Sequence, residues 1–177
     1  MATARTHSVT LVGVEGHLIK VEADIAQGLP ETILAGLPDT ALRESRDRIR
    51  AAIVNSGEKW PQSKITVGLS PASLPKRGSG FDVAIAIAIL AADGTLPLTS
   101  PAGTMFLAEL GLDGRLRPVP GVLPAVAAAA ASGMGTVAVA TQNTIEAKLV
   151  PGLRVIGAGS LTDVVIWLRG GEARGPH

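Results

Sequence analysis

Residues 81–92, FDVAIAIAILAA, form the segment that most restricts how this chain can fold. Apart from Asp82 near its start the run is apolar, and Ala alternates with Ile through most of it. It is too short to cross a membrane, which takes about 20 apolar residues in a helix. We interpret it as an apolar helix whose small side chains allow it to lie close on a β-sheet. The Ala-rich run 122–132, VLPAVAAAAAS, is interpreted as a second such helix.

The first part of the chain alternates apolar and polar residues, as is typical of strands with one buried face. Residues 8–14 and 17–26 predict a hairpin around Glu15-Gly16, and residues 32–35 predict a third strand. Asp39 or Thr40 is a suitable N-cap for a helix that runs to about Asn55. Further along we expect strands at 63–69, 136–140 and 154–156, a hairpin from 103–112 to 115–119, and helices at 144–149 and 161–168. This order predicts one α+β domain with helices packed on one face of a mixed sheet.

Composition and charge exclude several classes of protein. The chain has no cysteine, which excludes a disulfide scaffold or a thiolate metal site. Its formal net charge of +1 gives no overall basic field, so affinity for nucleic acid or an anionic membrane requires a local patch. Aromatic residues make up only 2%, which argues against a function built on base-stacking platforms.

Neither a metal site nor a targeting segment is visible in the sequence. His7, His17 and His177 lie far apart, and no cluster of His, Asp and Glu has the spacing of metal ligands. The N-terminus lacks the apolar region of a signal peptide. We therefore expect a cytoplasmic protein that does not enter the membrane.

The predicted helix near residues 40–55, TALRESRDRIRAAIVN, is the strongest local basic feature. Arg43, Arg46 and Arg50 recur on one face, and the guanidinium fork matches phosphate and carboxylate groups bidentately. Glu44 and Arg48 have the i, i+4 spacing of an ion pair, so a solvated face with internal ion pairs is the other interpretation. Lys76 and Arg77, from the loop that precedes residues 81–92, complete our candidate nucleic-acid surface.

Catalytic motifs are scarce. The phosphate-binding pattern G-x-x-x-x-G-K-[ST] is absent, and Gly78-Ser79-Gly80 is a weak candidate for anion binding at a helix start. A flexible turn explains these glycines as well. Because no histidine or cysteine is a candidate, the simplest nucleophilic site that the composition allows is a serine activated by a lysine.

Three segments, in this order along the chain, carry a resemblance to a known family. They are GLPDTALRESRDRIRAAIVNSG at 36–57, KITVGLSPASLPKRGSGFDVAIAIAILAA at 64–92 and AELGLDGRLRPVPGVLPAV at 108–126. Together they resemble the N-terminal domain of the Mg-chelatase-like AAA+ ATPases, the ComM/YifB family. The resemblance implies the fold of the Lon proteolytic domain over residues 1–170, followed by a linker or tail at 171–177.

The resemblance to Lon also predicts where a catalytic dyad would stand. Lon's serine lies in P-K-D-G-P-S-A-G, and the corresponding loop here places Gly80 at the serine position. Lon's lysine lies in P-V-G-G-[LIV]-K-E, and the corresponding run places Leu123 at the lysine position. Ser79 is one residue out of register. The resemblance therefore implies that the protease chemistry is absent, with a rearranged peptidase that uses Ser79 as a remote alternative.

The resemblance further implies a role within a larger assembly. Members of the family carry an ATPase module that binds ATP and Mg²⁺, form hexameric rings, and in ComM drive DNA branch migration during natural transformation. We expect this chain to be an excised or truncated part of such a protein, without a cofactor of its own. Its expected partners are its own ATPase module, neighbouring subunits and DNA. The alternative is a protein–protein interaction module whose arginines dock on an acidic surface without binding DNA.

Overall fold

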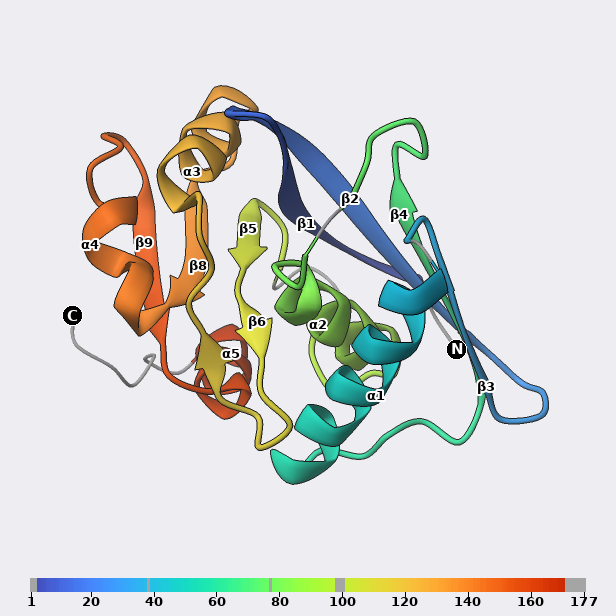
Figure 1. Cartoon of the computed structure of the whole chain (residues 1–177). Coiled ribbons are helices and arrows are strands. Elements are labelled where there is room, and N and C mark those ends of the chain that lie inside the picture. Colours follow the sequence, from blue (N-terminus) through green and yellow to red (C-terminus); the bar gives the residue numbers. More distant parts are fainter. Residues whose placement is uncertain (1–2, 38, 77, 98–100, 171–177) are drawn as a thin grey trace.

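A seven-stranded mixed sheet forms the centre of the molecule, in a computed structural model that describes residues 3–37, 39–76, 78–97 and 101–170 (Figure 1). The strand order is β3-β4-β2-β1-β5-β8-β9. The strands are β1 (Thr3–Val12), β2 (Glu15–Ala26), β3 (Glu31–Ala35), β4 (Lys64–Ser70), β5 (Thr104–Leu107), β8 (Thr136–Ala140) and β9 (Arg154–Ala158). The predicted tail at 171–177 lies outside the described residues.

Helices and two short strands complete the described chain. The helices are α1 (Asp39–Asn55), α2 (Asp82–Ala92), α3 (Val122–Ala131), α4 (Thr144–Ala147) and α5 (Leu161–Leu168), with a 3-10 turn at Thr141–Asn143. Strands β6 (Glu109–Leu110) and β7 (Leu116–Arg117) pair with each other outside the main sheet. Most of the predicted elements are therefore confirmed, with shifts of a few residues at their ends.

The first hairpin differs from the prediction in the position of its turn. Val12 pairs with Glu15, so the two turn residues are Gly13 and Val14 rather than Glu15 and Gly16. Gly13 has a φ of +65°, which suits the first central position of a tight two-residue hairpin turn. Strand β1 also begins at Thr3, five residues before the predicted start at Ser8.

Helices cover both faces of the sheet, so the prediction of helices on one face is wrong. On β5, Phe106 packs in one apolar cluster with α1, α2 and α5. Its neighbours Met105 and Leu107 pack in a second cluster with α3 and α4. Strand β8 alternates in the same way, because parallel strands within a mixed sheet are buried on both sides. The protein is thus a mixed α/β domain, with four parallel and two antiparallel strand pairings in the main sheet.

Helix α2 lies at the centre of the larger cluster, as its composition predicted. Each of its residues from Asp82 to Ala92 is buried. It packs against β1 and β2 on one side and α1 on the other (Figure 1). Because every residue after Asp82 is apolar, the helix has no polar side. Only the Asp82 side chain therefore requires a polar partner.

Two absences apply to the part of the chain that the structure describes. No helix in it combines the length and the apolar character needed to span a membrane. No group of three or more histidine, aspartate or glutamate side chains in it is arranged to hold a metal ion.

Candidate functional site

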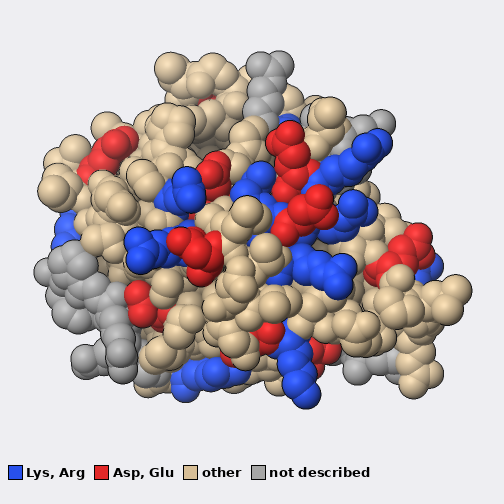
Figure 2. All heavy atoms as spheres, turned by 60° about the horizontal axis from the view of Figure 1, so that its bottom comes forward, with Lys and Arg blue, Asp and Glu red and all other residues tan. Residues whose placement is uncertain are grey.

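Helix α1 presents arginines on its outer side. Ile49, Ala52 and Ile53 are fully buried against the core, and the helical period then places Arg43, Arg46 and Arg50 in solvent. The predicted separation of the apolar residues and the arginines on different faces of α1 is therefore confirmed, and the binding of nucleic acid by these arginines stays a prediction. Figure 2 shows basic and acidic side chains next to one another on the face at the bottom of Figure 1, where α1 ends. This face has no field of a single sign, so local contacts decide what it binds.

Two of these arginines line a hollow that the sequence did not predict. Arg46 and Arg50 line it together with Trp60, from the loop between α1 and β4. The hollow has a volume of about 410 Å³. The Arg50 guanidinium carbon lies 5.8 Å from the centroid of the Trp60 ring, within the range of a cation–π contact. Arg46 Nε lies 3.5 Å from an Asp47 carboxylate oxygen.

The fourth arginine of α1 has a structural role. Arg48 Nε and Nη2 donate to the two carboxylate oxygens of Asp82, at 2.7 and 2.9 Å. The expected pairing with Glu44 is thus replaced by a pairing with a residue on α2. Burial raises the pKa of Asp82, while the guanidinium and the Leu110 backbone N–H, at 3.0 Å, act in the opposite direction. The carboxylate raises the pKa of Arg48.

Among its described residues, the loop that precedes α2 contributes no cation to the exposed arginines of α1. Lys76 is 3% exposed, and its Nζ donates to the carbonyl oxygens of Pro71 and Leu74, at 2.5 and 2.9 Å. Burial lowers its pKa. Lys76 therefore holds its own loop together, and its ammonium is not presented to a phosphate. Arg77, the other predicted loop cation, lies outside the described residues.

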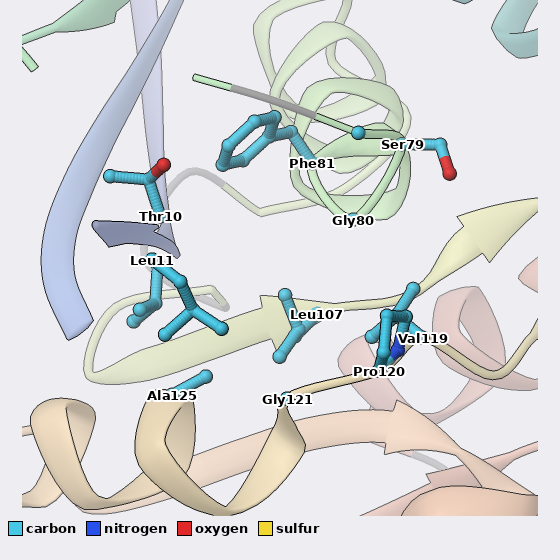
Figure 3. Close-up of a pocket in the computed structure, with 12 residues that line it drawn as sticks. Thr10, Leu11, Ser79, Gly80, Phe81, Leu107, Val119, Pro120, Gly121 and Ala125 are labelled. Atoms are coloured by element: carbon cyan, nitrogen blue, oxygen red, sulfur yellow. The ribbon is translucent and has the colours of Figure 1, made fainter. Parts of the chain in front are cut away.

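The first of the two predicted dyad positions, Gly80, lies beside an apolar pocket. The pocket has a volume of about 240 Å³, and Leu11, Leu107 and Val119 line it (Figure 3). A Cβ atom at Gly80 would lie 3.0 Å from Leu107 Cδ1, so a side chain there would require Leu107 to shift. None of the described residues that line this pocket carries an ionisable side chain.

The neighbouring Ser79 does not supply the missing nucleophile in the pocket. Figure 3 shows its hydroxyl directed away from Leu11 and Leu107. The hydroxyl donates instead to the carboxylate of Glu109. That carboxylate belongs to a different hollow, of about 400 Å³, which Ser79 and Arg48 also line. A carboxylate can orient the hydroxyl, but no described lysine or histidine stands beside it to act as a base.

The second dyad position, Leu123, lies in the first turn of α3 and is partly exposed. Its backbone N–H donates to a carboxylate oxygen of Glu146 at 2.7 Å, and its side chain is 40% exposed. Ile145 in α4 and Leu149, two residues after the end of α4, are 82% and 67% exposed. We call Leu123, Ile145 and Leu149 the α4 apolar surface. The sequence predicted a helix at 144–149 but not that these side chains face solvent.

Comparison with known proteins identifies relatives over nearly the whole chain. Residues 21–143 match the family model described as subunit ChlI of Mg-chelatase. A Mycobacterium tuberculosis protein is 50% identical over 96% of this chain. Competence protein ComM of Haemophilus influenzae is 42% identical over 97%, and YifB of Escherichia coli is 40% identical over 98%. The chain spans 34% of the length of each of these relatives.

Proposed function

This chain belongs to the family of the Mg-chelatase ChlI subunit, with ComM and YifB among its relatives, and from that premise we propose that it is a non-catalytic accessory domain of an AAA+ ATPase. The domain would have the fold of the Lon proteolytic domain. It would act in the cytoplasm, as part of a longer protein whose ATPase module binds ATP and Mg²⁺ and assembles into a ring. The name of the Haemophilus relative supports a role related to competence.

We propose that the domain's contribution is to contact DNA through α1. The observation that carries this proposal is the exposed row of Arg43, Arg46 and Arg50, two of which border the hollow beside Trp60. Arginine side chains bind phosphate oxygens bidentately. The row follows one helix face, so a strand of nucleic acid could contact all three residues along its backbone.

Binding of the chain to single-stranded and forked DNA tests this proposal. Fluorescence anisotropy at low salt measures binding where phosphate contacts are strongest. We expect saturable binding that weakens as salt is added. The absence of binding at low salt would overturn the DNA-contact proposal and leave the accessory role to rest on assembly alone.

The non-catalytic character of the domain predicts that it does not hydrolyse proteins. Gly80 and Leu123 supply neither a hydroxyl nor an amine, and the Ser79 hydroxyl points to Glu109 instead of into the pocket. We therefore expect no release of fragments from casein or from fluorogenic peptides, and no difference between the wild-type chain and a Ser79→Ala variant. Hydrolysis by the wild-type chain that disappears in Ser79→Ala would establish the peptidase alternative.

A second candidate function, docking on another protein, is favoured by the α4 apolar surface. Large apolar side chains that gather in solvent are typical of a protein interface. We propose that the ATPase module of the same protein, or a neighbouring subunit, covers this surface. The charged face of α1 would then be free to contact DNA.

A charge placed on the α4 apolar surface should weaken assembly of the ring without affecting the binding of DNA. The double variant Ile145→Asp, Leu149→Asp in the full-length protein is expected to shift the ring toward smaller species in sedimentation velocity. Burying two unpaired carboxylates in an interface is costly, so we expect at least a tenfold weaker association. Leu29→Asp is the matched control, because Leu29 is 87% exposed and lies elsewhere. An unchanged ring in the double variant would contradict this role.

A further inference from the structure

We propose that the hollow between α1, β3 and the loop that carries Trp60 receives an unpaired base of a single nucleic-acid strand. This inference rests on the proposed DNA contact and adds the structure of the ligand: a strand whose bases are accessible instead of a closed duplex. The name base pocket is used below for this hollow, whose walls include Arg46, Arg50, Trp60 and Gln62.

The first argument is the pairing of an aromatic ring with a guanidinium at the base pocket. Trp60 is partly buried and packs against the main apolar cluster. Arg50 is exposed, and its guanidinium carbon lies over the ring at 5.8 Å from the centroid, so a base that stacks on the indole takes the place of this guanidinium or stacks on it. Indole rings and guanidinium groups are the planar surfaces on which proteins stack unpaired bases. One tryptophan is enough for a single base, although the low aromatic content argues against a longer platform.

The second argument is the balance of charge in the base pocket. Its walls hold the cations of Arg46 and Arg50 together with the carboxylates of Glu31 and Asp47. A phosphate inside the hollow would meet both signs, so the interior of the pocket suits a neutral base better than a bare anion, and the phosphates stay on the outer face of α1. A nucleobase carries donors and acceptors on its edge, and carboxylates, amides and guanidinium groups are the side chains that pair with them.

The third argument is the position of the base pocket next to the exposed arginines. Arg43 continues the row of Arg46 and Arg50 toward the N-terminus of α1. A strand that places one base against Trp60 can therefore run its phosphates along the same helix face. In a duplex the bases are paired and stacked inside the helix, so the pocket would discriminate against duplex DNA.

Fluorescence of Trp60 tests the proposal directly. The chain has two tryptophans, so Trp167→Phe leaves Trp60 as the sole tryptophan reporter. We expect a single-stranded oligonucleotide to quench this emission saturably, and a duplex or an abasic strand of the same length to leave it unchanged.

An abasic strand retains the phosphates but lacks the bases, so it separates the base-pocket proposal from the DNA-contact proposal. Equal binding of abasic and base-bearing strands without quenching would overturn the base pocket but leave the DNA contact intact. Failure of every strand to bind would overturn both.

Substitution of the ring gives a second, independent measurement. Trp60→Leu keeps an apolar side chain but removes the planar surface, and we expect about tenfold weaker binding of the single strand. Trp60→Phe should restore most of that loss. Trp167→Leu is the matched control, because Trp167 also packs against the core and the guanidinium carbon of Arg154 lies 6.0 Å from its ring centroid.

Equal affinity of Trp60→Leu and the wild-type chain, with both folded as judged by circular dichroism, would contradict the proposal. If Trp60→Leu does not fold, the quenching experiment decides.

Discussion

Replacing Asp82 by alanine is expected to lower the free energy of unfolding by roughly 3 kcal/mol. Asp82 is 1% exposed and accepts two hydrogen bonds from Arg48 and one from the Leu110 backbone N–H. Without the carboxylate, the guanidinium of an arginine side chain that is 21% exposed loses its counter-ion, and the Leu110 amide loses its acceptor. The cost falls at the low end of the range for buried pairs, because water still reaches part of Arg48.

Urea unfolding of the variant measures this cost. Asp47→Ala is the control, because Asp47 pairs with Arg46 in solvent and such pairs contribute about 0–1 kcal/mol. The double variant Arg48→Met, Asp82→Ala removes both charges and should regain part of the stability lost in Asp82→Ala. A loss of less than about 1 kcal/mol in Asp82→Ala would contradict the view that this ion pair fixes α1 against α2.

Reversing the charge of Arg46 and Arg50 together is expected to weaken single-stranded DNA binding about 100-fold or more. Each charge-assisted contact to a phosphate is worth about 1.5–3 kcal/mol, and about 1.4 kcal/mol corresponds to a factor of ten. The glutamates would also repel the strand. Both residues lie on the exposed side of α1, so folding should be preserved.

The control variant for this prediction carries the same change in net charge elsewhere. Arg115→Glu with Arg154→Glu alters two exposed arginines outside α1 and should leave the affinity within a factor of about three. If the Arg46→Glu, Arg50→Glu variant binds DNA normally while the full-length ring fails to assemble, the arginines serve a protein contact instead. That result would favour the interaction module over DNA contact.

Most of the secondary structure could be predicted because its signals are local. Turn residues mark the ends of the strands, and the uninterrupted run of Ala and Ile in α2 predicted a buried helix. The helices on both faces of the sheet were not foreseen, because strand pairing depends on residues far apart in the chain. A signal was nevertheless present: β5 and β8, TMFL and TVAVA, are nearly continuous apolar runs, which is typical of strands covered on both sides.

The candidate site could be predicted only where helical periodicity determines exposure. Arg43, Arg46 and Arg50 face solvent because the opposite side of α1 carries the apolar residues. Arg48 and Lys76 could not be assigned, because their partners are a carboxylate on α2 and carbonyl oxygens of a folded loop. Trp60 was missed because its position beside Arg50 depends on the path of the loop after α1.

The salt dependence of binding to single-stranded DNA tests the central claim, that α1 contacts the phosphates of DNA, most directly. If Arg43, Arg46 and Arg50 each neutralise one phosphate, the logarithm of the binding constant should fall with the logarithm of salt concentration with a slope of about −2. The variant Arg43→Gln, Arg46→Gln, Arg50→Gln should bind weakly with a slope near zero. A wild-type affinity that does not change with salt, or a glutamine variant that keeps the full slope, would contradict the claim.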